Sequence, residues 1–246
     1  MVASFDKHIF WEALTSGPFW RGALLAIELT LVSFAASIVI GFFLALGRAS
    51  RSRTVRGIVF LYNWIFRATP TLLQLIFAWY ALPQFWHFFA GSWFKPFLAA
   101  FIVLSLNEAA YMSEIIRAGL LSVDPGQELA GRALGMTRAR ILRRVIVPQA
   151  VRIVIPPTGN EFITLLKLTS LASVISLHEL LTASQVRATF AFNYAEAYSA
   201  AVIYYLVIVS VLMVLQAQLE RRFTWTSRTR RRRRAVAMPA VAHDAR

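Results

Sequence analysis

Residues Leu24 to Leu46 read LLAIELTLVSFAASIVIGFFLAL, and Glu28 is the only charged residue in this run. A helix needs about 20 mostly apolar residues to cross the ~30 Å hydrocarbon core of a bilayer, because each residue adds ~1.5 Å. The run therefore predicts a membrane-spanning helix near the beginning of the chain.

Four further apolar runs have a similar length. The second is interrupted by Arg67 and Pro70, and the third and fourth contain several polar residues. The sequence thus predicts an all-α integral membrane protein with five spans, at about 24–46, 58–82, 96–116, 157–177 and 198–219. We expect these spans to form a single transmembrane domain over residues 1–220, followed by a basic, disordered tail over 221–246.

The composition excludes several other classes of protein. Only 15% of the residues are charged, against about a quarter in a typical soluble domain. The net charge of +14 is therefore not expected to serve nucleic-acid binding by a soluble fold. With no cysteine, no HExxH and only scattered histidines, no metal site, disulfide or membrane-embedded enzyme is expected. The first residues lack the pattern of a cleaved signal peptide.

Lysine and arginine in short loops stay on the cytoplasmic side, so their distribution predicts orientation. The connections after spans one and three, and the tail after span five, are rich in arginine, whereas the alternate connections carry only Lys95 and Arg187. The N-terminus is therefore expected outside and the C-terminus inside. The run Arg230–Arg234 is interpreted as an anchor on anionic lipid, with a dedicated partner site as the alternative.

The connection after span three, 122–150, is predicted to be organised. A turn at Val123–Gly126 ends the preceding helix, and Thr137 is expected to cap a second helix. Pro148 is expected to end that helix. From the residues alone, the segment is a surface helix on lipid headgroups, a knob that fits another subunit, or an ordinary loop.

Four motifs resemble one known family. PGQELAGRALGMTRARILRRVIVPQAVRIVIPPTGNEF is similar to the cytoplasmic loop of permease subunits in ATP-binding cassette importers, in particular the polar amino acid uptake group. FRATPTLLQ, AYMSEIIRAG and LLKLTSLASVI resemble further motifs of that group, in the expected order over most of residues 20–220.

The resemblance implies a type I importer fold in a bacterial inner membrane. It implies a coupling helix within 128–144 that docks on a separate ATPase, which binds ATP and Mg²⁺, while this chain binds no cofactor and is not an enzyme. It also implies a second permease subunit and an extracytoplasmic substrate-binding protein. The candidate coupling residues are Glu128, Leu129, Ala130, Gly131, Ala133, Leu134, Gly135, Met136 and Arg140.

The chain departs from the family pattern at three places. Glu128 lies one residue earlier than the family glutamate, which is about 100° round a helix. Ala68 replaces the glycine of the FRGTP motif, and Leu168 stands where Asp or Asn is common. The contact made by the family glutamate is therefore in question here.

Polar residues inside spans are costly and usually face a cavity or a partner. Asn107 and Tyr111 form one helical stripe with Glu114, and Asn160, Thr164 and Lys167 form another. With Glu108 and Glu161, these stripes are candidates for the path of a zwitterionic substrate. The alternative is that they only hold helices together.

Prolines mark candidate breaks at Thr69–Pro70 and Pro156–Pro157. Thr69–Pro70 is interpreted as the end of a surface helix, 55–67, before a span that begins at Pro70; a gating hinge is the alternative. The predicted function is ATP-driven import of a polar amino acid or opine by alternating access. An ion-gradient-driven carrier or channel is the alternative, although no inverted repeat is visible.

Overall fold

The structure, a computed structural model, describes residues 5–236, except the side chains of Ala191 and of 224–236. Every regular element in this part of the chain is helical. The elements are α1 (Lys7–Thr15), α2 (Gly17–Arg48), α3 (Arg53–Ala68), α4 (Thr71–Ile76), η1 (Phe77–Ala81), α5 (Leu82–Phe85), η2 (His87–Ala90), α6 (Pro96–Leu121), α7 (Pro125–Ala133), α8 (Arg138–Ile141), η3 (Leu142–Ile146), α9 (Val147–Leu168), η4 (Thr169–Ile175), α10 (Leu180–Ala191) and α11 (Tyr194–Val236).

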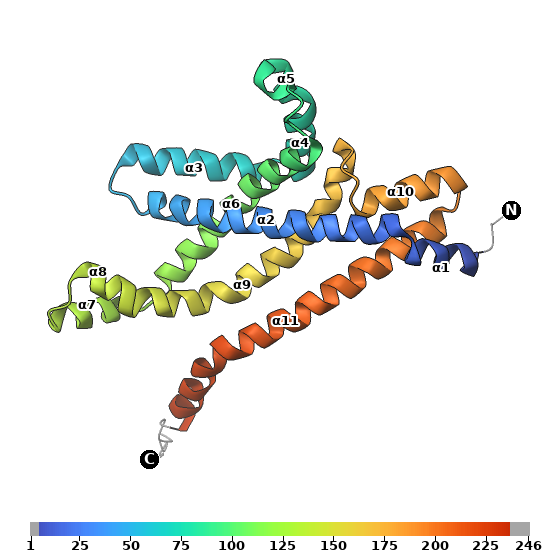
Figure 1. Ribbon diagram of the computed structural model, residues 1–246. Coiled ribbons are helices and arrows are strands. Elements are labelled where there is room, and N and C mark those ends of the chain that lie inside the picture. The colour runs from blue at the N-terminus through green and yellow to red at the C-terminus, as the bar shows by residue number, and fades with distance from the viewer. Residues whose placement is uncertain (1–4, 237–246) are drawn as a thin grey trace, which may run out of the picture.

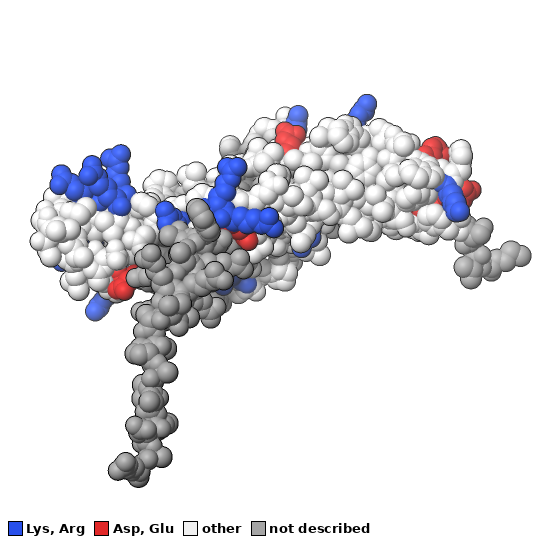
Figure 2. Space-filling model, turned by 90° about the horizontal axis from the view of Figure 1, so that it is seen from below, with Lys and Arg blue, Asp and Glu red and all other residues white. Residues whose placement is uncertain are grey.

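The long helices α2, α6, α9 and α11 cross one another obliquely in one bundle (Figure 1). The short helices α7 and α8 lie at one end of the bundle, and α1 and α10 lie toward the other. The α2–α3 connection and the C-terminal part of α11 point toward the α7–α8 end. In the space-filling view, a cluster of basic side chains lies over that end and most of the remaining surface is uncharged (Figure 2).

Three helices are long and apolar enough to cross a membrane: α2, α6 and Tyr194–Phe223 of α11. Two bent pairs satisfy the same criteria together, Arg53–Ala68 with Thr71–Phe85 and Arg138–Ile175 with Leu180–Phe190. The bends are 102° and 48°. The described residues therefore contain three to five candidate spans, and each of the five predicted spans overlaps one of these three helices or two bent pairs.

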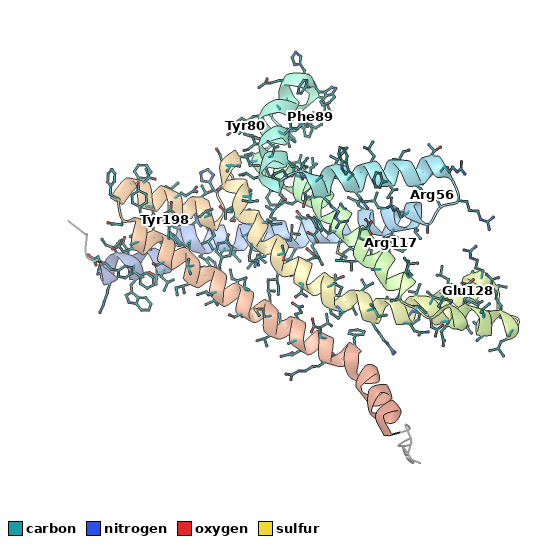
Figure 3. The ribbon with its side chains drawn as sticks, turned by 180° about the vertical axis from the view of Figure 1, so that it is seen from behind. Arg56, Tyr80, Phe89, Arg117, Glu128 and Tyr198 are labelled. Atoms are coloured by element: carbon teal, nitrogen blue, oxygen red, sulfur yellow. The ribbon has the colours of Figure 1, made fainter. Side chains whose placement is uncertain are left out.

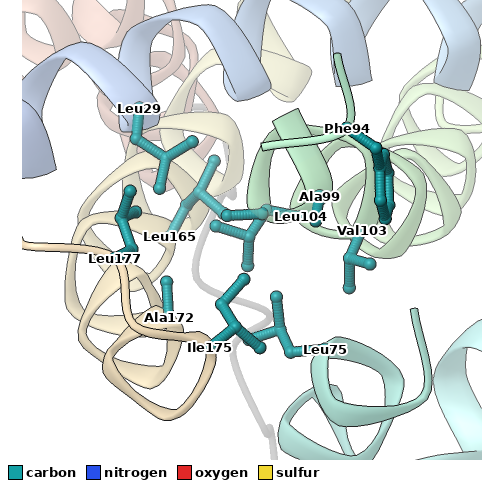
Figure 4. Close-up of a cluster of buried hydrophobic side chains, with 11 residues drawn as sticks. Leu29, Leu75, Phe94, Ala99, Val103, Leu104, Leu165, Ala172, Ile175 and Leu177 are labelled. Carbon is teal, nitrogen blue, oxygen red and sulfur yellow. The ribbon is translucent and has the colours of Figure 1, made fainter. Parts of the chain in front are cut away.

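The core lies where α2, α4, α6 and α9 meet, around Leu29, Leu75, Leu104, Leu165 and Ile175 (Figure 4). In a bilayer, lipid tails are as apolar as leucine, so helices associate mainly through close van der Waals packing. Small side chains make this possible on α6, where four alanines are fully buried. They are Ala99, Ala100, Ala109 and Ala110.

The break at Thr69–Pro70 differs from the interpretation that a complete span begins at Pro70. The helical segment after Pro70 ends at Phe85, which is too short to cross the hydrocarbon core alone. Before the break, α3 packs on α2 and α6. Residues 53–85 satisfy the criteria for a span only as a bent pair, and the position of α3 on the membrane surface stays a prediction.

Two predicted proline breaks are wrong. The chain is helical from Arg138 to Leu168, and Pro156 and Pro157 lie inside α9. At Pro148 the preceding turn, Leu142–Ile146, is π-helical, which leaves room for the proline ring beside the previous carbonyls. Inside a packed bundle, neighbouring helices support such a helix, and α9 packs on both α6 and α11.

The predicted tail begins inside a helix. The backbone of α11 is helical to Val236, so residue 221 marks no structural boundary. The arginines at 230–234 have described backbone but no described side chains, and 237–246 lies outside the described residues. The role of Arg230–Arg234 stays a prediction.

Candidate functional site

The α7–α8 knob, residues 125–141, is a pair of short helices joined by a tight turn. Asp124 caps α7, because its Oδ1 accepts a hydrogen bond from the N–H of Gly126 at 2.7 Å. The Thr137 hydroxyl oxygen accepts one from the N–H of Arg140 at 3.4 Å and caps α8, as the sequence predicts.

Two glycines shape the turn between these helices. Gly135 has φ +71°, and the N–H groups of Gly135 and Met136 donate to the carbonyls of Arg132 and Gly131, which ends α7 in a Schellman motif. Gly131 is buried against Ile141, and a Cβ at Gly131 would lie 2.8 Å from Ile141 Cγ1. The two glycines therefore let α8 fold back closely onto α7.

The outer face of the knob is apolar and exposed. Leu134 at its tip is 81% exposed and Leu129 is 67% exposed, and Ala130 and Ala133 are exposed beside them. Large exposed apolar patches usually mark an interaction site. Figure 3 labels Glu128 at this end, far from Tyr198 at the opposite end of the molecule. The knob thus presents an apolar surface with arginines around it.

The remaining candidate residues of the knob have local roles. Glu128 pairs with Arg132 one turn later on α7, so its carboxylate is already engaged within the chain. Met136 is half-buried, and the Arg140 side chain is exposed. The effect of the one-residue shift of Glu128 on any docking contact stays a prediction.

Asn107 braces the bend between α3 and α4. Pro70 has no N–H, so the carbonyl of Phe66, four residues earlier, lacks its helical partner. The side-chain amide of Asn107 donates to this carbonyl at 3.0 Å and to Gln74 Oε1 at 3.0 Å. Gln74 Nε2 in turn donates to the Phe66 carbonyl and to Thr69 Oγ1. Asn107 is therefore satisfied inside the chain.

Gln74 was not among the residues predicted for the site. One signal in the sequence could have identified it. Gln74 lies four residues after Pro70, whose missing N–H leaves the Phe66 carbonyl unpaired, and such a carbonyl needs a side-chain donor.

The rest of the first stripe opens onto a pocket rather than toward α9. The Arg67 guanidinium lies over the Tyr111 ring in a cation–π contact, with Arg67 Cζ 5.4 Å from the ring centroid. Both line a pocket of about 370 Å³ between the end of α2, α3 and α6, together with Arg48, Asn63 and Glu114. Glu114 is paired with Arg117 at 2.9 Å.

Two glutamates, Glu108 on α6 and Glu161 on α9, lie on helices that pack against each other. Glu108 is 1% exposed, and its Oε1 has no hydrogen-bond partner among the described residues. Glu161 is half-buried on α9. A buried carboxylate with an unpaired oxygen is costly unless a cation, a proton or water completes it. We call Glu108 and Glu161 the carboxylate pair, because both are acidic groups on packed helices of the bundle.

The second stripe is on the surface of α9. Asn160, Thr164 and Lys167 are exposed, and Asn160 Oδ1 accepts a hydrogen bond from Gln216 Nε2 of α11 at 2.9 Å. The two predicted stripes therefore do not face each other within one chain, and their part in a substrate path stays a prediction.

Comparisons with known proteins place the chain in a family. The model of the binding-protein-dependent transport system inner membrane component matches residues 37–225. The arginine transport system permease protein ArgU of Corynebacterium glutamicum is 43% identical over 82% of this chain and 66% of its own length. The L-cystine transport system permease protein TcyB of Bacillus subtilis is 40% identical over 87% of each chain. The glutamine transport system permease protein GlnP of Escherichia coli K12 is 33% identical over 89% of this chain and 97% of its own.

Solved structures agree with the sequence matches. The crystal structure of an amino acid ABC transporter with histidines superposes with a TM-score of 0.80 and 33% identity, over 90% of this chain and all of the other. An inward-facing MetNI methionine ABC transporter shares the fold, with a TM-score of 0.72 at 19% identity over 89% of this chain. Members of this family are not enzymes themselves, and a separate subunit hydrolyses ATP. The chain belongs to the family of binding-protein-dependent transport system inner membrane components, the permease subunits of ATP-binding cassette importers.

Proposed function

We propose that the chain is the permease subunit of an importer that moves polar amino acids or opine-like compounds across the bacterial cytoplasmic membrane. The observation that carries this is the family match over residues 37–225 combined with an exposed apolar knob inside the matched region. The named relatives transport arginine, cystine and glutamine, which supports an amino acid as the class of substrate.

The proposed topology has five spans, with the N-terminus outside and the C-terminus inside. The arginine-rich α2–α3 connection, the α7–α8 knob and the C-terminal part of α11 lie toward one end of the bundle (Figure 1), and cytoplasmic loops are enriched in arginine. Counting each bent pair as one span gives the odd number that this distribution requires.

The proposed coupling surface is the α7–α8 knob. Leu129 and Leu134 are exposed on a compact pair of helices that is fixed to α6 and α9, so a push on the knob is transmitted to two long helices of the bundle. A separate ATPase binds ATP and Mg²⁺ and moves the knob, and this chain binds no cofactor. Two permease copies, or this chain and a related one, then rock between outward- and inward-facing states. An extracytoplasmic binding protein delivers the substrate.

The carboxylate pair is the proposed contact for the cationic group of the substrate. One oxygen of Glu108 has no partner among the described residues, and Glu161 is half-buried on the neighbouring helix α9, so an ammonium or guanidinium group would supply the missing hydrogen bond. Asn160, Thr164 and Lys167 are exposed on α9, where a second permease subunit would complete the path.

Co-purification of the ATPase tests this proposal. Replacing Gly135 would also strain a residue with φ +71°, so the sharper variant is Leu134→Asp at the tip of the knob. Its control is Phe190→Asp, since Phe190 is 84% exposed on α10 at the other end of the bundle. We expect the ATPase to be lost with Leu134→Asp and retained with Phe190→Asp. Retention with both variants would contradict coupling through the knob.

A further inference from the structure

A groove on the side of the bundle is lined only by apolar side chains. It has a volume of about 330 Å³ and lies between α2, α6 and α9. Its lining consists of Ile38, Val39, Phe42, Ile116, Leu120, Val147, Ala150, Val151 and Val154. None of these residues contributes to the knob or to the carboxylate pair.

Two arginines lie where the groove meets the α7–α8 end of the bundle. In the π-helical turn, the N–H of Val147 donates to the carbonyl of Leu142, so Leu142 and Arg143 share the face of α9 that carries Val147. Arg143 and its neighbour Arg144 have exposed side chains, and no salt bridge to either is found among the described residues. Two basic residues therefore lie in the turn that directly precedes the α9 lining of the groove.

The faces of α6 distinguish the groove from the proposed substrate path. Ile116 lies five residues after Tyr111, which places it ~140° round the helix from the polar stripe. The groove thus opens on the side of α6 that faces away from the pocket lined by Tyr111 and Glu114.

We propose that the groove holds an acyl chain of an anionic phospholipid of the inner leaflet, whose phosphate is bound by Arg143 and Arg144. An acyl chain matches a lining without polar groups, and a phosphate matches two arginines on the proposed cytoplasmic side. The bound lipid spans α2, α6 and α9 and so stabilises the helices that lead from the knob into the bundle. This inference rests on the proposed orientation, in which the knob is cytoplasmic.

Lipid retention by the purified complex, measured by native mass spectrometry, tests the inference. The complex is taken from nanodiscs that contain equal amounts of phosphatidylglycerol and phosphatidylcholine. The wild type is expected to retain one phosphatidylglycerol per copy of this chain. The double variant Arg143→Gln/Arg144→Gln is expected to bind it roughly thirtyfold more weakly, since each arginine near an anionic surface contributes on the order of fivefold.

Matched variants separate the site from general charge and packing effects. Arg51→Gln/Arg53→Gln removes the same charge from the α2–α3 connection and is expected to leave retention unchanged. Val151→Trp fills the groove and is expected to expel the lipid without a change of charge, whereas Val211→Trp on the exposed surface of α11 is expected not to. Glycerol phosphate, which has no acyl chain, is expected not to compete.

Each alternative outcome overturns the inference in a recognisable way. Competition by glycerol phosphate indicates a free-phosphate site, and equal retention of both lipids indicates a groove without headgroup selectivity. Retention that is unchanged in both Arg143→Gln/Arg144→Gln and Val151→Trp refutes the site. The ATPase is expected to remain bound in all of these variants, and failure of an ATPase to co-purify even with the wild type would instead count against the proposed function.

Discussion

The variant Asn107→Ala distinguishes two possible roles of Asn107, which are to stabilise the break between α3 and α4 and to contact the substrate. The variant removes two hydrogen bonds, to the Phe66 carbonyl and to Gln74 Oε1. Side-chain hydrogen bonds between membrane helices average ~0.6 kcal/mol and reach ~1.7 kcal/mol, so the expected destabilisation is about 1–2 kcal/mol. For a chain of this size that lowers the thermal midpoint by roughly 2–8 °C.

The assay is thermal unfolding of the complex in nanodiscs, combined with uptake kinetics in proteoliposomes. Asn107 and Gln74 both donate a hydrogen bond to the Phe66 carbonyl. The losses of unfolding free energy caused by Asn107→Ala and Gln74→Ala are therefore expected to be non-additive, with a coupling free energy of about 0.5 kcal/mol or more. Gln84→Ala, which removes an exposed amide with one local hydrogen bond, is the control and is expected to change stability by less than ~0.5 kcal/mol. An unchanged thermal midpoint for Asn107→Ala, together with a raised KM, would refute the bracing role and restore Asn107 to the substrate path.

Two further variants test the carboxylate pair and the knob. Glu161→Ala is expected to lower uptake and to raise KM about tenfold or more, because a charge-assisted contact with the substrate is lost. Membrane insertion of this variant is expected to be unchanged. Normal uptake kinetics would remove Glu161 from the substrate path. Gly131→Val is expected to destabilise the packing of α7 on α8 by ~1–3 kcal/mol, because a Cβ at this position would lie 2.8 Å from Ile141. The same variant is expected to weaken ATPase binding in a pull-down. Gly57→Val, where a Cβ has open space, is the control, and equal ATPase binding by both variants would contradict close packing in the knob.

Local signals in the sequence located much of this architecture. The uninterrupted apolar run predicted the helix around Leu24–Leu46, because a run of that length can be recognised from composition alone. The cap at Thr137 was also predictable, because capping depends on residues within one turn.

Features that depend on distant partners were not predictable. Whether Pro148 and Pro156 break a helix depends on a π-helical turn and on packing against α6 and α11, which no local pattern encodes. The stripe of Asn107 and Tyr111 was identified from spacing, but spacing does not show which helix faces it. The structure turns that stripe toward α3 and α4 and buries Glu108, one residue along, inside the bundle.

The orientation of the knob is measured most directly by labelling single cysteines in intact cells. The chain has no cysteine of its own, so Leu134→Cys and Phe190→Cys each introduce one accessible thiol at opposite ends of the bundle. We expect a membrane-impermeant maleimide to label Phe190→Cys in intact cells and to label Leu134→Cys only after the membrane is opened. Labelling of Leu134→Cys from outside an intact cell would place the knob where no ATPase can reach it and would contradict the proposed importer.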